Sequence, residues 1–199
     1  MILTTINVLL LIVFLVTAFT VVYSFVFSVS GLFGRKRNYA TKEVYKKIAV
    51  LIPAYKEDTV ILETANHALF QNYPSHRYDV IVIADSLQQE TLTKLRKLPI
   101  KVIEVSFDQS TKSKALNAAF STLTDHYEIA VILDADNLMK ADFLTKINAA
   151  FTNGCYAIQG HRIAKNLNTR FAILDGISEE INNHIFRKGQ QALGFSSSV

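Results

Sequence analysis

The stretch that decides the fold is Ile129-Ala130-Val131-Ile132-Leu133-Asp134-Ala135-Asp136-Asn137, an apolar run that ends in two carboxylates. Five consecutive apolar residues, rich in β-branched types, predict a strand that is buried on both faces of a parallel sheet. Side chains two apart in a strand point to the same side, so an extended Asp134-Ala135-Asp136 would bring both carboxylates into one small volume. Two carboxylates at such a short distance repel one another unless a cation lies between them. A hard divalent cation that itself holds phosphate groups would fit, whereas an Asp-rich turn or helix cap is the simpler alternative.

Two earlier apolar runs also end in polar residues. The first covers residues 48–53 and ends at Pro53, which cannot donate a ladder hydrogen bond and so predicts the end of a strand. The second covers residues 79–85 and ends at Asp85. Apolar spacing and helix breakers predict helices at about residues 60–70, 90–98 and 112–123, and a short strand at 101–105. This alternation predicts an α/β fold with a mostly parallel sheet and helices on both faces.

Ligands of such sheets bind beyond the carboxyl ends of the strands. The polar residues expected there, or at the start of the following helix, are Tyr55, Glu57, Asp85, Lys112, Lys114, Asp134 and Asp136. Acids at strand ends beside a basic helix start suit a nucleoside diphosphate held through a metal ion. Asp136 would ligate the cation, Asp134 would assist it or hold the ribose, and Lys112 would offset the diphosphate charge. Each residue alone also has a structural explanation, so the prediction depends on their combination.

The N-terminal segment predicts a membrane anchor. No charge occurs from Ile6 to Phe33, and these about 28 residues exceed the roughly 20 that cross the hydrocarbon core. A signal peptide would need a basic start and a small-residue cleavage site, and no Lys or Arg precedes the apolar run. The following basic cluster belongs on the cytoplasmic side and consists of Arg35, Lys36, Arg37, Lys42, Lys46 and Lys47. We expect a transmembrane helix at residues 1–33, a basic linker at 34–47 and a cytoplasmic domain at 48–199, held at the cell (inner) membrane.

Several other classes of protein find little support in the sequence. A dinucleotide fold or a P-loop needs a glycine-rich turn, yet no glycine occurs between Gly34 and Gly154. No nucleic-acid partner is expected, because the basic residues beyond the linker are scattered and no reader motif is present. The lone Cys155 cannot form an intramolecular disulfide, and we expect it to be a buried small residue.

Four segments together resemble the donor-site motifs of family 2 glycosyltransferases. They are residues 48–58 (Ile-Ala-Val-Leu-Ile-Pro-Ala-Tyr-Lys-Glu-Asp), 82–85 (Val-Ile-Ala-Asp), 112–117 (Lys-Ser-Lys-Ala-Leu-Asn) and 133–137 (Leu-Asp-Ala-Asp-Asn). The resemblance runs from about Ile48 to Val199 and is strongest to the membrane-bound branch that includes relatives of cellulose and hyaluronan synthases. It implies a GT-A fold, a nucleotide-sugar donor with a UDP-sugar as the first expectation, and Mg²⁺ or Mn²⁺ as cofactor. It also implies a glycan or lipid-linked acceptor and inversion at the anomeric carbon.

The resemblance implies roles for single residues as well. The nucleoside-contacting strand end of the family is similar to Pro53, Ala54, Tyr55 and Glu57, and its base-contacting Asp is similar to Asp85. Lys112 falls on the Lys of a Lys-Gly-x-Ala-Leu pattern in which Ser113 replaces the glycine. Asp134 and Asp136 match the D-x-D motif, with Asp136 as the main metal ligand. The segment after the next strand is similar to Gln159-Gly160-His161-Arg162 and Asn166, although His161 and Arg162 also have a structural explanation.

One part of the implied reaction has no residue in this sequence. The family's general base is an Asp beyond a Gly-Ser-Gly or Gly-Thr-Gly segment, and residues 192–199 look like the lead-in to that segment. We therefore expect a chain with the donor half and without the acceptor half, whose catalytic residue is unknown. Glu179 and Glu180 lie in a helical stretch without a matching motif and are not expected to replace the base. Two alternatives stay open: a membrane-tethered module that binds a nucleotide or a partner without turnover, and a phosphotransfer hydrolase.

Overall fold

The computed structural model describes residues 2–34, 39–40, 43–124, 126–166 and 168–195. The chain forms two compact units, and each is described by itself. The sheet unit is Tyr39–Ala157, and the helical unit combines Met1–Asn38 with Ile158–Val199. The basic residues 35–37 and Lys42 of the predicted linker, and the predicted lead-in at residues 196–199, lie outside the described residues.

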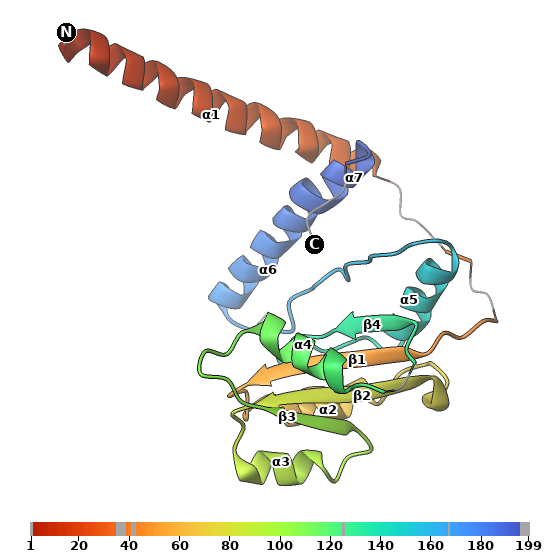
Figure 1. The fold of residues 1–199 in the computed structure, drawn as a ribbon. Coiled ribbons are helices and arrows are strands. Elements are labelled where there is room, and N and C mark those ends of the chain that lie inside the picture. Colours follow the sequence, from red (N-terminus) through yellow and green to blue (C-terminus); the bar gives the residue numbers. More distant parts are fainter. Residues whose placement is uncertain (1, 35–38, 41–42, 125, 167, 196–199) are drawn as a thin grey trace. The chain divides into compact units, whose positions relative to one another are not determined.

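The sheet unit contains four parallel strands in the order β3-β2-β1-β4 (Figure 1). Their bounds are β1 Ile48–Tyr55, β2 Tyr78–Asp85, β3 Lys101–Val105 and β4 Ile129–Ile132. The continuous apolar runs of β1 and β2 occupy the two central positions, where neighbouring strands and helices bury nearly every residue. The predicted parallel sheet is confirmed.

Helices cover both faces of this sheet (Figure 1). Their bounds are α2 Ile61–Ala68, α3 Gln89–Leu95, α4 Lys112–Thr122 and α5 Phe143–Thr152, and a 3₁₀ turn covers Ser75–Arg77. One face of the sheet packs against α4. The core between them consists of Ala49, Leu51, Ile81, Ile83, Ala115 and Ala119. Figure 1 shows α2 on the opposite side of the sheet, and α2 buries Ile61 and Ala65. The predicted α/β layering is confirmed.

Pro53 lies inside β1, which corrects the prediction that it ends the strand. β1 pairs with β4 only as far as Leu51 and Ile132, and the Leu51 carbonyl accepts the Leu133 N–H (2.9 Å) on that side. Residues 51 and 53 turn their backbone polar groups to the same side of the strand. The missing N–H of Pro53 therefore faces the side where β4 has ended, and β1 continues beside β2 to Tyr55 without losing a ladder bond.

β4 is exposed on one face, so the prediction of burial on both faces is wrong. Ile129 and Val131 are buried, whereas Ala130 and Ile132 are exposed, Ile132 to 49%. Among the described residues β4 is an edge strand, and α4 packs over β1, β2 and β3. An apolar run alone does not show which of its faces another element covers.

A buried amide fixes the segment before β1 to α5. Asn148 is 1% exposed, and its Oδ1 accepts hydrogen bonds from the Lys46 N–H (3.1 Å) and the Tyr73 hydroxyl (3.1 Å). Its Nδ2 donates to the Val44 carbonyl (2.8 Å). Cys155 is half-buried rather than buried, because it lies after the end of α5 with its Sγ 3.1 Å from the Tyr39 hydroxyl.

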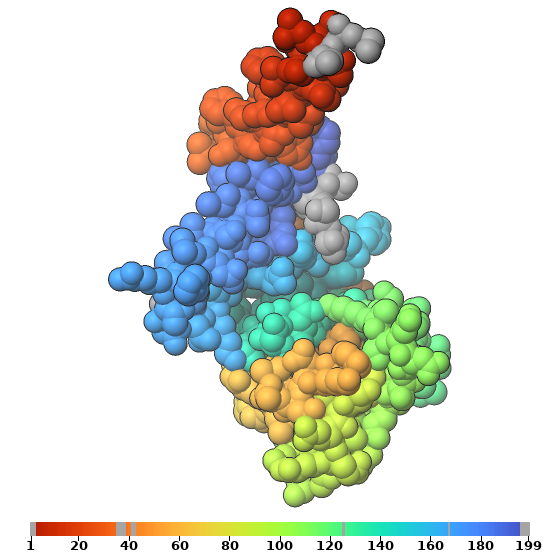
Figure 2. Space-filling view, turned by 90° about the vertical axis from the view of Figure 1, so that its left-hand side faces the viewer, coloured from red at the N-terminus to blue at the C-terminus, as the bar shows by residue number. Residues whose placement is uncertain are grey.

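The helical unit consists of α1 (Ile2–Phe33), α6 (Arg170–Asn182), a π-helical segment η2 (Asn183–Gly189) and α7 (Gln190–Ala192). The C-terminal part of α1 packs against η2 and α7 (Figures 1 and 2). A Cβ atom added at Gly189 would overlap the Phe27 carbonyl oxygen, so glycine permits this close approach. Nε2 of His184 lies 2.9 Å from the Ser28 carbonyl oxygen, and Nε2 of Gln190 donates to the Tyr23 hydroxyl (2.8 Å).

Among the described residues, α1 is the helix that is long and apolar enough to cross a membrane. The span Leu3–Phe33 contains 31 residues and no charged side chain. At about 1.5 Å per residue, a helix of this length exceeds the roughly 30 Å of a hydrocarbon core. Its N-terminal part is exposed in Figure 2, where it is drawn in red.

Candidate functional site

A cavity of about 270 Å³ lies at the carboxyl ends of β1, β2 and β4, beside the start of α4. Its lining residues are Pro53, Ala54, Tyr55, Glu57, Asp85, Ser110, Thr111, Lys112, Ala115, Asp134, Ala135 and Asp136. All eight residues predicted to bind the nucleotide and the metal are in this set, although four separate segments supply them. The structure brings them together because the carboxyl ends of parallel strands meet at one edge of a sheet.

The ends of β1 and β2 place an exposed aromatic ring beside a buried acid. Tyr55 and Asp85 are register partners, and each is followed by a residue with positive φ, Lys56 at 57° and Ser86 at 56°. These residues in the left-handed conformation turn the backbone away from the sheet at the ends of β1 and β2, directly after Tyr55 and Asp85. The Lys56 N–H donates to the Asp85 carbonyl (3.1 Å), which joins the two turns.

Asp85 is a charged side chain with almost no access to water. It is 2% exposed, and its Oδ1 accepts a hydrogen bond from the Ser86 hydroxyl (3.0 Å). A buried carboxylate is costly unless donors surround it, so a ligand with N–H groups would be favoured at this point of the cavity. Tyr55 is 49% exposed and can offer its ring to a flat ligand.

The two carboxylates of the D-x-D motif lie on a turn. β4 ends at Ile132, and the Asn137 N–H donates to the Asp134 carbonyl (3.1 Å). The prediction that Asp134-Ala135-Asp136 is extended is therefore wrong, because a reverse turn rather than strand alternation brings both acids to the cavity. The buried Thr64 hydroxyl of α2 donates to the Ala135 carbonyl (2.6 Å) and holds this turn from below.

Lys112 makes an ion pair with Asp134 across the cavity. Its ammonium contacts Oδ1 of Asp134, and the Asn137 side-chain amide donates to Oδ2 (3.2 Å). The Lys112 and Asp134 side chains are 50% and 40% exposed. A pair this exposed contributes at most about 1 kcal/mol to stability, because water screens both charges. Lys112 is thus held near the acids by a contact that is easily exchanged.

Sequence reasoning did not assign four lining residues to the site. Ala135 lies between the two acids of the D-x-D motif, and Ser110, Thr111 and Ala115 lie in the loop and helix around Lys112. Thr111 is the N-cap of α4, and its Oγ1 accepts the Lys114 N–H (3.2 Å). A Thr directly before a predicted helix is an N-cap signal, so this residue could have been found. Ser110 and Ala115 follow only from the three-dimensional path of the loop and the helix.

Asp134 and Asp136 fit a hard divalent cation through the chemistry of their oxygens. The described residues contain no group of three or more His, Cys, Asp or Glu side chains close enough to hold a metal. A cation at this turn would therefore take further ligands from elsewhere. Substrate phosphates and water commonly complete a Mg²⁺ site of this kind.

His161, Arg162, Glu179 and Glu180 lie in the helical unit and contact one another there. His161 Nε2 lies 3.0 Å from Glu180 Oε1, while Glu179 accepts contacts from Arg162 (3.6 Å) and Arg187 (3.3 Å). These contacts agree with the structural explanation of His161 and Arg162. The described residues between α5 and α6 contain no strand, so the strand expected before Gln159 is absent there, and Asn166 is exposed.

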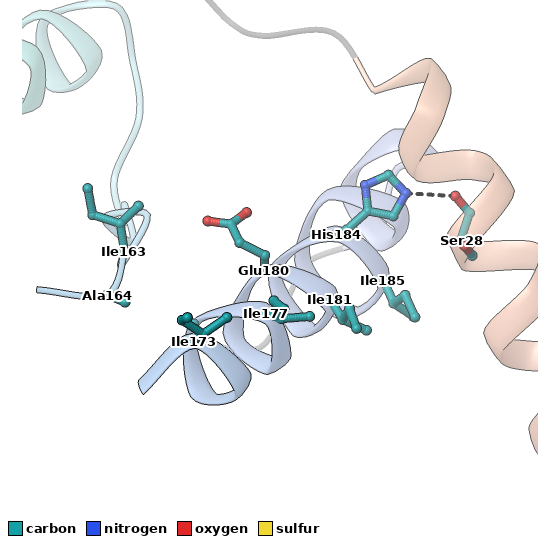
Figure 3. A pocket seen from close by; sticks show the side chains of 10 residues that line it. Ser28, Ile163, Ala164, Ile173, Ile177, Glu180, Ile181, His184 and Ile185 are labelled. Atoms are coloured by element: carbon teal, nitrogen blue, oxygen red, sulfur yellow. Dashed lines mark hydrogen bonds between the residues drawn. The ribbon is translucent and has the colours of Figure 1, made fainter. Parts of the chain in front are cut away.

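The helical unit has a larger, apolar cavity of about 930 Å³ (Figure 3). Its lining includes five isoleucines, at positions 163, 173, 177, 181 and 185. Figure 3 shows His184 turned toward Ser28 of α1, and Glu180 on the side of the helix that faces Ile163. The cavity lacks the clustered acids and the lysine found in the sheet unit.

Comparison with solved structures gives one protein of similar fold and a second, weaker match. A mannosyltransferase from Pyrobaculum calidifontis, PcManGT in complex with GDP-Man and Mn²⁺, is 23% identical with a TM-score of 0.55, over 67% of this chain and 41% of that chain. TarS 1-349 of S. aureus is 20% identical with a TM-score of 0.48, over 63% of this chain and 43% of that chain. The chain thus spans less than half the length of the mannosyltransferase. The GT-A fold predicted from the motifs is confirmed.

A search of curated protein sequences finds no match. Residues 46–193, which include all four motifs and the whole cavity, match the model of the glycosyltransferase-like family 2. This match covers more than half of the chain. The chain therefore belongs to glycosyltransferase-like family 2.

Proposed function

We propose that this chain is the donor-binding part of a metal-dependent, inverting glycosyltransferase that is anchored in a membrane. The observation that carries the proposal is the single cavity at which all eight predicted residues meet. Two findings support it: the match to the family and the fold shared with a mannosyltransferase that holds GDP-Man and Mn²⁺. The proposed donor is a nucleotide sugar, with a UDP-sugar as the first candidate and a GDP-sugar as the second.

The proposed roles follow from the environments of the residues. Tyr55 would cover the base, and the buried Asp85 would accept its N–H groups. The backbone at Pro53 and Ala54, with Glu57, would form the rest of the nucleoside site. Lys112 would offset the charge of the diphosphate, and Asp136 with Asp134 would hold Mg²⁺ or Mn²⁺.

In the proposed reaction, an acceptor hydroxyl attacks the anomeric carbon from the side opposite the nucleoside diphosphate, which leaves with the bonding electron pair. Inversion follows from this single displacement. A bound divalent cation would supply charge neutralisation at the leaving diphosphate. Lys112 would add a second positive charge there. The cavity residues at the carboxyl ends of the strands would fix the donor's orientation. A general base takes the hydroxyl proton, and we assign that role to no residue of this chain.

The proposal also includes a location and an acceptor. α1 would cross the cell (inner) membrane, and the basic residues 35–37, 42, 46 and 47 would keep the sheet unit on the cytoplasmic side. We retain the division into residues 1–33, 34–47 and 48–199 as part of this proposal. An acceptor that is a glycan or a lipid-linked sugar suits an enzyme held at a membrane surface.

A module that binds a nucleotide without turnover is the second candidate. The observation that favours it is the position of the acids. Those at the cavity are assigned to the proposed binding roles, Glu179 contacts Arg162 and Arg187, and Glu180 Oε1 lies 3.0 Å from Nε2 of His161.

Incubation of the full chain in detergent with UDP- and GDP-sugars and Mn²⁺ separates the candidates. Release of the nucleoside diphosphate, with transfer or hydrolysis of the sugar, would support the glycosyltransferase. Tight binding without release would support the module. Release of inorganic phosphate alone would support a phosphotransfer hydrolase and would contradict the proposal.

A further inference from the structure

Both carboxylate oxygens of Asp134 already accept hydrogen bonds. The Lys112 ammonium donates to Oδ1, and the Asn137 amide donates to Oδ2 at 3.2 Å. Each of these oxygens keeps a further lone pair that a divalent cation could use, but a cation on Oδ1 would lie beside the Lys112 ammonium. Lys112 is the donor that the cation would repel, because both carry positive charge.

Lys112 is placed where it can move. It is the first residue of α4, and its ammonium sits on a flexible four-carbon stem that is half-exposed. The helix dipole disfavours a positive charge at a helix N-terminus, so this position does not serve the stability of α4. The Lys112 ammonium is stabilised at this position by its contact with Asp134. A phosphate group could take the place of Asp134 as the partner of the ammonium.

The protein alone supplies few ligands for the cation. Among the residues that the structure describes, no three carboxylate, imidazole or thiol groups gather. Diphosphate oxygens would therefore have to contribute to the coordination shell. A cation that arrives without the nucleotide meets two acids, one of which is neutralised by Lys112.

We propose that Lys112 is a displaceable counter-ion that couples cation binding to nucleotide binding. This inference rests on the proposed function. In the free protein, Lys112 neutralises Asp134 and weakens cation binding. When a nucleoside diphosphate enters, its negative charge draws Lys112 away, and Asp134 becomes available to the cation. By linkage, each ligand then raises the affinity of the other by the same factor.

Removal of the ammonium therefore has opposite effects on the two ligands. In Lys112→Gln, Mn²⁺ alone should bind roughly three- to tenfold more tightly, the range expected for an exposed charge a few ångströms away. The nucleoside diphosphate should bind more weakly, because one positive charge near it is lost. The factor by which the nucleotide tightens Mn²⁺ binding should fall by a similar amount.

The experiment measures free Mn²⁺ by electron paramagnetic resonance during titration of the full chain in detergent. Each titration is done without nucleotide and with saturating UDP or GDP. The variants are the wild type, Lys112→Gln and the matched control Lys114→Gln. Lys114 carries the same charge two residues away on α4, but its ammonium donates to the Gln109 carbonyl (2.7 Å). Circular dichroism confirms that each variant is folded.

The inference expects Lys112→Gln to bind Mn²⁺ alone more tightly than both other proteins and to show the smallest gain from nucleotide. Equal Mn²⁺ affinity in Lys112→Gln and Lys114→Gln would overturn it. If nucleotide binds but tightens Mn²⁺ binding equally in the wild type and Lys112→Gln, the coupling role fails and the proposed function stands. If the wild type binds neither UDP nor GDP at any Mn²⁺ concentration, the proposed function fails together with the coupling.

Discussion

Replacing Thr64 by valine tests whether α2 holds the turn that carries the two acids. The Thr64 hydroxyl donates to the Ala135 carbonyl at 2.6 Å, and the two residues are 2% and 6% exposed. Valine has nearly the same shape as threonine but no hydroxyl, so the Ala135 carbonyl loses its donor. Because this carbonyl is buried, water cannot take the place of the hydroxyl. An unsatisfied buried carbonyl costs about 1–3 kcal/mol. We therefore expect the free energy of unfolding of the sheet unit to fall by about 2 kcal/mol, or roughly 30-fold in the opening equilibrium.

Hydrogen–deuterium exchange of peptides from β1 and β2, followed through a urea series, measures this free energy in the sheet unit alone. Thr93→Val is the matched control, because the Thr93 hydroxyl donates to the Gln89 carbonyl on an exposed helix surface (2.8 Å). The control should change stability by less than about 0.5 kcal/mol. Thr64→Val should also weaken Mn²⁺ binding, since the turn at residues 134–136 loses its support. Equal effects of the two substitutions on stability would refute the reasoning.

Two further predictions concern packing and pH. Gly189→Ala should separate the C-terminal part of α1 from η2, because the new methyl group would overlap the Phe27 carbonyl oxygen. Faster proteolysis within residues 183–195 would show this separation, and an unchanged rate of proteolysis would contradict it. Burial raises the pKa of Tyr73 to about 12 and that of Tyr127 to about 12, from 10.0. Between pH 10 and 12 the folded state therefore binds more protons than the unfolded state. The contribution of these two tyrosines to the free energy of unfolding is fully present below pH 10 and is lost as the pH rises toward 12. Burial also raises the pKa of Tyr78. Absorbance at 295 nm should therefore show a group of tyrosines that titrate above pH 10 in the folded chain, and a single transition near pH 10 would contradict this.

The sheet was predictable because its signals are local. The continuous apolar runs of β1 and β2 are typical of strands buried between helices. Asp85 marked the end of β2, whereas the predicted end of β1 at Pro53 was two residues short of Tyr55. The short strand β3 was predicted with the bounds that the structure shows, Lys101–Val105. Since parallel strands align their carboxyl ends, the residues of the candidate site followed from the order of the elements.

The remaining features depend on contacts between distant parts of the chain. Pro53 is tolerated inside β1 because β4 stops short of it, and the bounds of β4 do not follow from residues near Pro53. Likewise, the turn at residues 134–136 is stabilised by Thr64, which lies 71 positions before its hydrogen-bond partner Ala135. Ile132 looks like a core residue in the sequence, yet its face of β4 is exposed. Period-two reasoning could not distinguish the turn from an extended D-x-D, because both bring the acids together.

We propose that the sheet unit binds a nucleoside diphosphate through a cation held by Asp136. Calorimetric titration of the full chain with UDP and with GDP, in Mn²⁺ and then in excess chelator, tests it most directly. Asp136→Asn removes the proposed ligand, and Asp142→Asn is the matched control, because Asp142 forms an exposed pair with Lys146 at 2.5 Å outside the cavity. We expect binding in Mn²⁺ that weakens at least about tenfold with chelator or in Asp136→Asn but not in Asp142→Asn. Equal affinity under all four conditions would contradict it.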